Sequence, residues 1–319
     1  MAPDCGRAER PAPRVVVVGS ASRDLARDDP RGWRLGGGVT YGALALARLG
    51  VRCAALIGVD GEAMAAHELD LLRSAGVEVV PVPLAYAPVF VNEETPAGRV
   101  QTAVDVSDPL PVAALPAPWR SAPGWLFAPV AGELPEEWAS VPSADAMVAL
   151  GWQGLLRTLE AGKRVEPRGP WPSALLARAD LIGVSLHDLP PAWRLAQLAD
   201  LCRDGAEVVL TAGGRGGVLT RLPVAPHRPI HYPAIPAAPV VDATGAGDVT
   251  LTALLAARMC HPAAATASPS AWSASRRRHL LLAAAAASLT VRQQGVSGVP
   301  ALASIRHLLT ARNAEPEPA

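Results

Sequence analysis

Apolar runs of strand length alternate with helix-length amphipathic segments in the first part of the chain. Residues 14–19 form a β-branched run that ends in glycine, which is typical of a strand buried on both faces of a parallel sheet. Glycines also end the two helical segments that follow. The expected elements are a strand at 14–19, a helix at 39–49, a strand at 51–59, a helix at 62–75 and a strand at 77–82. This alternation predicts an α/β fold with a doubly wound, mostly parallel sheet and helices on both faces.

The pattern changes between residues 85 and 107. Two extended stretches at 89–92 and 99–104 flank a Glu-Thr-Pro-Ala-Gly turn, and we interpret this hairpin as a small β lid. A proline-rich linker is expected at 109–123. The alternation then resumes with strands at 146–150, 181–184 and 207–211 and with helices at 192–203, 246–259, 276–292 and 301–312. We expect a single domain over residues 1–319, with flexible tails at 1–13 and 314–319.

Composition argues against several classes of protein. Half of the residues are hydrophobic and 18% are charged, which is enough to build a core, and basic and acidic residues balance at 29 each. That balance gives no electrostatic reason to expect a nucleic acid or an anionic membrane as partner. Lys163 is the only lysine, in an Ala-Gly-Lys-Arg-Val stretch that we expect to be a loop. Phosphate loops, protein-kinase sites and Schiff-base sites that depend on lysine are therefore not expected.

The cysteines and histidines give no metal or disulfide pattern. No C-x-x-C pair and no H-E-x-x-H motif is present, so a reducing cytoplasm is the expected environment. Residues 1–14 hold no apolar signal core. The apolar run at 280–291 is shorter than the roughly 20 residues that span a membrane, and we expect a buried, alanine-rich helix there. The Arg276–Arg278 run is expected on a solvated face at the start of that helix.

The strongest chemical signal is Asp-Ala-Thr-Gly-Ala-Gly-Asp at residues 242–248, directly before a helical pattern. Small residues at a helix start leave backbone N–H groups accessible, and these donors and the positive helix end form an anion site that suits a phosphoryl group. Asp248 lies at the mouth of that site, where a carboxylate can accept the proton of an attacking hydroxyl. Taken alone, the motif is also compatible with a glycine-rich turn in which Asp248 caps the helix.

Several motifs in the same order resemble those of the ribokinase-like, or PfkB, family of sugar and nucleoside kinases, from Val15 to about Leu309. The Thr-Gly-Ala-Gly-Asp segment resembles the C-terminal signature of the family. That resemblance implies Asp248 as the catalytic base and an anion hole at Gly245, Ala246 and Gly247. Gly36-Gly37-Gly38, followed by Ala-Arg-Leu-Gly at residues 47–50, resembles the N-terminal signature. The family has a ribokinase-like α/β fold with a β lid.

The resemblance also implies residues that bind the two substrates. Gly19-Ser20 followed by Asp24 resembles the first-strand turn whose aspartate binds substrate hydroxyls, and the Gly37-Gly38 loop lets the backbone approach a ligand closely. The segment Thr-Ala-Gly-Gly-Arg-Gly at 211–216 resembles the turn that contacts ATP. The implied ATP contacts are Thr211, Gly213, Arg215, Gly216 and Thr244. A surface turn at Asp24, a loop that needs positive φ at the glycines and a plain strand-to-strand turn at Thr211 are the respective alternatives.

The sequence departs from the family pattern at several places. Tyr41 stands where the signature usually has an asparagine that contacts the sugar, so a different acceptor surface is expected. The Asn-x-x-Glu motif that orders magnesium and phosphate aligns with Ser185-Leu186-His187-Asp188. The lost amide and shortened acid imply that Asp188 acts on Mg²⁺ through water. Thr250 replaces an aromatic residue after the base, and Ala243 replaces threonine or serine.

The lid and the segment at 151–157 resemble a PfkB subgroup that includes plant-type inositol kinases and uncharacterised bacterial sugar kinases. The shared features are Phe-x-Asn and Gly-x-x-Gln in the hairpin and Gln-Gly-Leu-Leu-Arg after the 146–150 strand. The resemblance makes candidate specificity residues of Asn92, Gln101, Gln153 and Arg157, and ordinary surface roles are the alternative. Arg157 and Arg215 are also the candidate sources of positive charge.

These observations predict a cytoplasmic kinase that uses ATP and Mg²⁺ to phosphorylate a hydroxyl of a sugar or cyclitol. Asp24, Gly37, Gly38 and Tyr41 would hold the acceptor, and the lid would exclude water. No nucleic acid or membrane partner is expected, and a homodimer through the lid is one expected assembly. Two alternatives stay open: a nucleoside kinase, with Trp152 as an apolar slot for the base, and a catalytically idle ribokinase-like binding or regulatory protein, suggested by the weakened Ser185/Asp188 motif.

Overall fold

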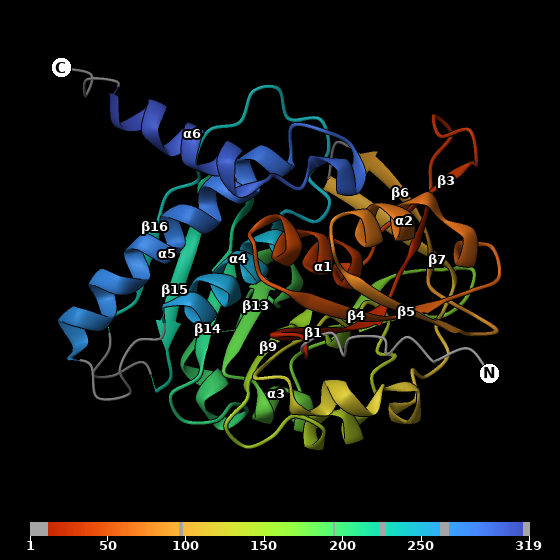
Figure 1. The fold of residues 1–319 in the computed structure, drawn as a ribbon, viewed down its shortest axis with the longest axis horizontal. Coiled ribbons are helices and arrows are strands. Elements are labelled where there is room, and N and C mark those ends of the chain that lie inside the picture. Colours follow the sequence, from red (N-terminus) through yellow and green to blue (C-terminus); the bar gives the residue numbers. More distant parts are fainter. Residues whose placement is uncertain (1–11, 96–97, 194, 224–227, 262–267, 315–319) are drawn as a thin grey trace, which may run out of the picture.

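A nine-stranded sheet forms the centre of the molecule (Figure 1). The computed structural model describes residues 12–95, 98–193, 195–223, 228–261 and 268–314. The strand order is β16-β15-β14-β13-β9-β8-β1-β4-β5, parallel from β14 to β5 and antiparallel at the edge formed by β15 and β16. The strands are β1 Val15–Ser20, β4 Cys53–Val59, β5 Glu78–Pro83, β8 Gly124–Phe127, β9 Met147–Gly151, β13 Leu181–Ser185, β14 Glu207–Thr211, β15 Gly217–Arg221 and β16 Ile230–Tyr232.

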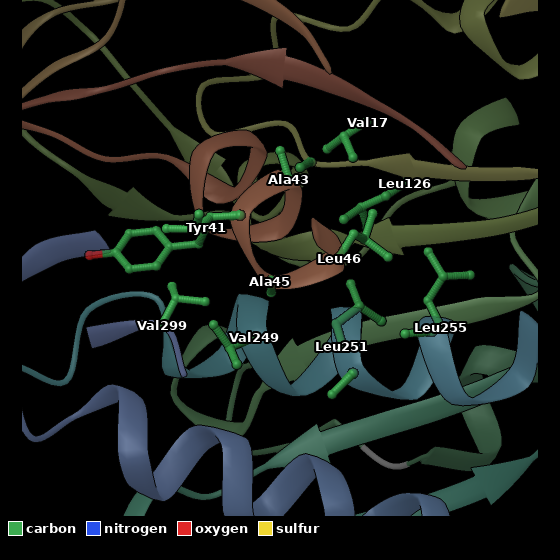
Figure 2. Close-up of a cluster of buried hydrophobic side chains, with 14 of the residues drawn as sticks. Val17, Tyr41, Ala43, Ala45, Leu46, Leu126, Val249, Leu251, Leu255 and Val299 are labelled. Atoms are coloured by element: carbon green, nitrogen blue, oxygen red, sulfur yellow. The ribbon is translucent and has the colours of Figure 1, made fainter. Parts of the chain in front are cut away.

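Most of the helices cover one face of this sheet. The described α-helices are α1 Gly38–Arg48, α2 His67–Ser74, α3 Ala174–Arg178, α4 Ala246–Cys260, α5 Pro269–Thr290 and α6 Leu302–Ala314. Val15 and Val17 of β1 point toward the face that α1, α4 and α5 cover, and Figure 2 shows Val17, Tyr41 of α1 and Val249 of α4 in one buried cluster. Because every side chain of β1 is fully buried, the valine run fits a central strand that is covered on both sides.

The opposite face carries α3 and short 3₁₀ turns (Figure 1). Val16 and Val18 point to this side, where aromatic side chains fill the space: Trp125 and Phe127 of β8 and Trp138 of a 3₁₀ turn. Three 3₁₀ turns supply much of this layer: η2 Val112–Ala114, η3 Ala117–Ser121 and η4 Glu136–Ser140. The segment expected as a proline-rich linker thus contributes buried Leu110, Leu115 and Trp119 to the core.

A second sheet, of five strands, lies beside the end of the main sheet that carries the functional loops. Its order is β11-β7-β6-β2-β3. The strands are β2 Arg23–Leu25, β3 Trp33–Leu35, β6 Val89–Thr95, β7 Gly98–Asp105 and β11 Lys163–Arg164. A separate short pair joins β10 Arg157–Thr158 to β12 Glu166–Pro167. We call the five-stranded sheet the lid sheet. The predicted hairpin supplies β6 and β7, and residues far away in sequence complete it.

The predicted fold class is confirmed: the structure has a large, mostly parallel sheet flanked by helices. Among the described residues, no helix combines the length and the apolar character that crossing a membrane requires. The helix expected at 192–203 is wrong, because the described part forms only the 3₁₀ helix η7 Leu195–Asp200. Pro190 precedes a turn at residues 191–192, and Gly205, with a φ of 80°, follows the segment, so turn-forming residues bound a short element.

Two expectations about charged residues are also wrong. Ser268 caps α5 through its side-chain oxygen and the helix begins at Pro269, so Arg276 lies inside the helix and only 3% of it is exposed. Its guanidinium forms a buried ion pair with Glu207 at 2.9 Å, whereas Arg277 and Arg278 are exposed as expected. Lys163 is in strand β11 rather than a loop, paired with Ala103 of β7.

Candidate active site

Asp248 lies where two helix starts and a strand end meet. It is in the first turn of α4, at the carboxyl-end edge of the parallel sheet, where ligands of open α/β sheets collect. Gly38 opens α1, and a Cβ atom at that position would stand 2.8 Å from Asp248 Oδ1. Gly151 ends β9, and its Cβ would be 4.0 Å from the same oxygen. The half-buried carboxylate therefore fits a space that small residues keep open.

The surroundings of Asp248 suit a general base. Burial raises the pKa of its carboxyl group to about 6, while the nearby positive charge of Arg157 lowers that pKa and the negative charge of Asp188 raises it. A base with a pKa near the working pH is ionised at neutral pH yet can still take up a proton. The sequence-based alternative, in which Asp248 caps the helix, is not supported, because no side-chain hydrogen bond caps α4.

The predicted anion hole lies at the start of α4. Gly245 is the N-cap residue in the left-handed conformation, with φ of 78°, which favours glycine. The Ala246 N–H reaches back to Ala243 O at 3.4 Å, and the space around the Cα of Gly247 is open. The N–H groups of a first helical turn have no intrahelical acceptor. The exposed Gly247 therefore presents its backbone to solvent at the positive end of the helix.

Asp242 fixes the loop that leads into this helix start. Its Oδ1 accepts a hydrogen bond from the Thr244 N–H at 2.9 Å, and its Oδ2 accepts one from the Gly295 N–H at 3.0 Å. The Val241 N–H also donates to Val291 O at 2.7 Å. The loop that carries Thr244 and Gly245 is thereby tied to the segment after α5. Such contacts hold the anion hole in place before a ligand arrives.

Each residue of the Gly36-Gly37-Gly38 run faces a different group. A Cβ on Gly36 would lie 2.6 Å from Asp24 Oδ2, one on Gly37 would lie 2.8 Å from Ser20 O, and one on Gly38 would meet Asp248. Gly37 also has a φ of 87°. The run therefore brings the predicted acceptor carboxylate Asp24, on β2 of the lid sheet, and the predicted base to either end of one tripeptide.

Tyr41 is buried, with 2% of its surface exposed, and its ring lies against Gly245. Figure 2 shows it on α1, within the cluster that also holds Val249 and Val299. A role of Tyr41 in holding the acceptor stays a prediction. The residue next to the Tyr41 ring is Gly245, the N-cap of α4.

The four candidate specificity residues form two hydrogen-bonded groups. The Gln101 Nε2 atom donates to Asn92 Oδ1 at 2.8 Å, and the Arg157 Nη1 atom donates to Gln101 Oε1 at 3.1 Å. Gln153 donates to the Asp188 carboxylate at 3.2 and 3.4 Å. Both groups reach toward Asp248, since the charges of Arg157 and Asp188 act on its pKa.

The predicted donor turn closes the hairpin between β14 and β15. Thr211 ends β14 beside Ser185 of β13, and the 3₁₀ turn η8 Gly213–Arg215 follows. Gly213 and Gly216 have φ of 57° and 88°, and a Cβ on Gly216 would stand 2.1 Å from Tyr232 O. Gly213 and Arg215 are exposed at this edge. The segment is thus a strand-to-strand turn, as the alternative had it, and contact with ATP stays a prediction.

Glu133 is a buried residue of this region that sequence reasoning missed. Its carboxylate is 2% exposed and accepts hydrogen bonds from the Ser20 N–H at 2.8 Å, the Val130 N–H at 3.0 and 3.2 Å, and the Ala131 N–H at 2.8 Å. Burial raises the pKa of this carboxyl, and the backbone N–H groups act in the opposite direction. Glu133 joins the end of β1 to the loop after β8. A lone glutamate in a Gly-Glu-Leu stretch carries no sequence signal for that role.

Two further observations bear on metal and base binding. No group of three or more histidine, cysteine, aspartate or glutamate side chains is arranged to hold a metal within the ranges that the structure describes. Magnesium in kinases is held largely by phosphates and by one or two carboxylates, and the water-mediated role of Asp188 stays a prediction. Trp152 is 1% exposed in the core below the sheet, and the expectation that it lines a nucleobase slot is wrong.

The mostly parallel sheet, the open start of α4 with an aspartate in its first turn, and the β lid agree with the arrangement expected of a small-molecule kinase. Residues 173–302 match the family model described as pfkB family carbohydrate kinase. The resemblance to PfkB-type kinases with a hydroxyl acceptor that the sequence predicts is thereby confirmed for these residues, which include Asp248 and the start of α4. A comparison with curated protein sequences found no match.

Solved structures show the same fold over most of the chain. A pyrophosphate-dependent kinase of the ribokinase family, complexed with a pyrophosphate analogue and myo-inositol, has a TM-score of 0.70 and 19% identity, covering 92% of this chain and 99% of that one. Arabidopsis thaliana ribokinase with ribose and ATP has a TM-score of 0.65 and 22% identity, covering 93% and 99%. Methanocaldococcus jannaschii nucleoside kinase has 0.63 and 14%, covering 94% and 99%. At these identities the likeness establishes the fold.

Proposed function

We propose that the protein transfers the γ-phosphate of ATP to a hydroxyl group of a sugar or cyclitol. The observation that carries this proposal is the placement of Asp248, with its raised pKa, between the open start of α4 and the glycine run that leads to Asp24. A base, an anion site and a second carboxylate for hydroxyl groups are the parts that phosphorylation of a polyol requires.

The residues divide the reaction between them. Asp24 accepts hydrogen bonds from acceptor hydroxyls and orients the molecule. Asp248 takes the proton of the attacking hydroxyl. The hydroxyl oxygen bonds to the γ-phosphorus, and the bond from that phosphorus to the ADP oxygen breaks. The backbone N–H groups at the start of α4 stabilise the charge on the phosphoryl oxygens. Closure of the lid sheet over the acceptor keeps water from attacking the donor in its place.

The donor occupies the edge formed by the turn after β14. Thr211, Gly213, Arg215 and Gly216 lie on its rim, and Thr244 precedes the anion hole. Magnesium bound with the donor phosphates would neutralise part of their charge, with Asp188 holding it through water. Because a fold neighbour is named as pyrophosphate-dependent, pyrophosphate is a second donor to test. Pairing of two copies through their lid sheets is the assembly that we propose.

A cyclitol or sugar is favoured over a nucleoside by one observation. The tryptophan that would have formed a base slot is buried in the core, and the polar side chains that lead from the lid sheet toward Asp248 suit hydroxyl-rich ligands. The idle-protein alternative is disfavoured, since Asp248, its anion hole and its glycine neighbours form one assembled site.

The test is a turnover assay over a panel of inositols, hexoses, ribose and nucleosides, with ATP or pyrophosphate and Mg²⁺. We expect phosphorylation of at least one polyol and a loss of about 10³-fold or more in kcat for Asp248→Asn. Undiminished turnover in that variant would overturn the role of Asp248. Tight acceptor binding without turnover on any donor would support the binding-protein alternative.

A further inference from the structure

A line of three polar side chains connects the lid sheet to the neighbourhood of the base. Asn92 of β6 and Gln101 of β7 are register partners in the lid sheet, and Arg157 begins β10. Two hydrogen bonds join them, from Gln101 Nε2 to Asn92 Oδ1 and from Arg157 Nη1 to Gln101 Oε1. All three side chains are half-buried.

The direction of these bonds assigns both ends of the Gln101 amide. Its nitrogen is used on Asn92, and its oxygen is thereby turned toward a guanidinium, which can only donate. These two bonds use one N–H and one lone pair of the amide and fix its orientation within the protein. The hydrogen-bonded amides of Asn92 and Gln101 can hold the planar, rigid guanidinium of an arginine in one orientation.

Arg157 belongs to a segment that follows the edge of the active site. That segment starts at Gly151, beside Asp248, and it is pinned where a Cβ on Gly154 would stand 2.3 Å from Pro129 O. The charged groups that act on Asp248 are Arg157 and Asp188, with opposite signs. Lys163, the single lysine of the chain, is on the outer strand β11 and forms an ion pair with Glu160. Arg157 is therefore the basic side chain whose charge reaches the base.

We propose that Asn92 and Gln101 are positioning residues for Arg157, and that the Arg157 guanidinium stabilises the negative charge of the phosphoryl group in transfer to the acceptor. This inference rests on the proposed kinase activity. It replaces direct acceptor contact, the role expected for the two lid amides. A guanidinium held in a fixed orientation binds phosphate oxygens in a bidentate manner and loses little conformational freedom on doing so.

A double-mutant cycle tests the proposal. Arg157→Leu and Gln101→Leu are each expected to lower kcat by about 10- to 100-fold, with the acceptor KM changed by less than about threefold. In the double variant, kcat should fall no more than about twofold below that of Arg157→Leu, because both changes remove one function. Gln101→Glu keeps an oxygen for the guanidinium and should retain kcat within about threefold. This variant keeps the test valid if leucine disturbs the lid.

Val104→Ala is the matched control, since Val104 is exposed on the same strand at a position of opposite parity to Gln101. A rise in acceptor KM for Gln101→Leu in both backgrounds, with additive effects, would show that Gln101 contacts the acceptor and would overturn the proposal.

Calorimetric binding of a non-hydrolysable ATP analogue with Mg²⁺ gives a readout that needs no turnover. The two leucine variants should weaken it by equal, non-additive factors, and equal affinity in all proteins would overturn the role of Arg157. The Asp248→Asn assay tests the kinase activity separately.

Discussion

The ring of Tyr41 lies against the α-carbon of Gly245, close enough that a Cβ atom at position 245 would stand 2.2 Å from both Cδ1 and Cε1. One residue is in α1 and the other caps α4, so the contact joins the two helices whose first turns border Asp248. The aromatic residue that departs from the family signature thereby packs against the N-cap of α4, where the anion hole is predicted.

This contact predicts different results for two changes. Gly245→Ala forces a side chain into the tyrosine ring at a φ of 78°, and we expect a loss of about 100-fold or more in kcat/KM. Tyr41→Phe keeps the ring and should leave the acceptor KM within about threefold of wild type. Steady-state kinetics with both substrates measure this. A large rise in acceptor KM for Tyr41→Phe would instead place the hydroxyl in the acceptor site.

Gly38→Ala tests the space beside the base. The added methyl would lie 2.8 Å from Asp248 Oδ1 and would push the carboxylate from its position, so kcat should fall by about 10- to 100-fold. The matched control is Gly169→Ala at an exposed position with open space around it, which should leave kcat unchanged. An active Gly38→Ala enzyme would mean that the carboxylate can work from another rotamer.

The raised pKa of Asp248 predicts how activity depends on pH. Only the ionised carboxylate can accept a proton, so kcat/KM should rise with pH and level off above about 6. Arg157→Leu removes a charge that lowers this pKa, so the rise should move to higher pH in that variant. Profiles of kcat/KM between pH 4.5 and 9, as roughly the range that spans such a titration, provide the measurement. A flat acidic limb would contradict a titrating base.

The same shift makes a prediction about stability. The folded pKa of about 6 exceeds the ordinary value of 3.8, so the stabilisation from the protonated carboxyl is complete below the lower value and is lost as pH rises through the higher one. Asp248→Asn stays neutral throughout and should be more stable than wild type at pH 8 by about 1–2 kcal/mol, with no difference near pH 4. Urea unfolding at both pH values measures this, with exposed Asp145→Asn as control. Equal stability at pH 8 would contradict the burial cost.

Two buried carboxylates should prove important for folding. Glu133→Gln places an amide N–H₂ among backbone N–H donors, and we expect a loss of about 2–3 kcal/mol, against less than about 0.5 kcal/mol for exposed Glu137→Gln. Arg276→Met removes the closer of the two arginines that pair with buried Glu207, leaving Arg258 at 3.5 Å and the Trp272 indole N–H, and should cost about 3–5 kcal/mol, whereas Arg277→Met should cost little. Urea unfolding at pH 7 checks both pairs, and equal losses within a pair would contradict the assigned contacts.

The strands and the main helices follow from the sequence because their patterns are local. The β1 valines and the helix after Gly245 have boundaries that glycine and β-branched residues mark directly. The lid sheet could be predicted only at β6 and β7, since β2, β3 and β11 are short and acquire partners only through the tertiary fold. Trp152 and Arg276 were misplaced for the same reason: their burial depends on residues far away in sequence.

The candidate site divides along the same line. Asp248 and its glycines carry a backbone signature that a short motif can record. The attachment of Arg157 to Gln101 and of Gln153 to Asp188 depends on how a loop folds back onto the lid sheet, and spacing along the chain holds no trace of it. Glu133 shows the limit most clearly, because it binds two backbone segments that are 113 and 3 residues away.

The three glycines from 36 to 38 also separate Asp24 from Asp248 by a fixed length of backbone. Asp24 is in contact with one end of this tripeptide and Asp248 with the other, and neither contact leaves room for a longer side chain between them. The span between the two carboxylates, for which we propose acceptor binding and proton abstraction, is therefore set by the backbone of this tripeptide. Exchanges at other positions can change which ring fits the site and which of its hydroxyl groups faces Asp248, whereas the distance between the two carboxylates depends on the conformation of this tripeptide.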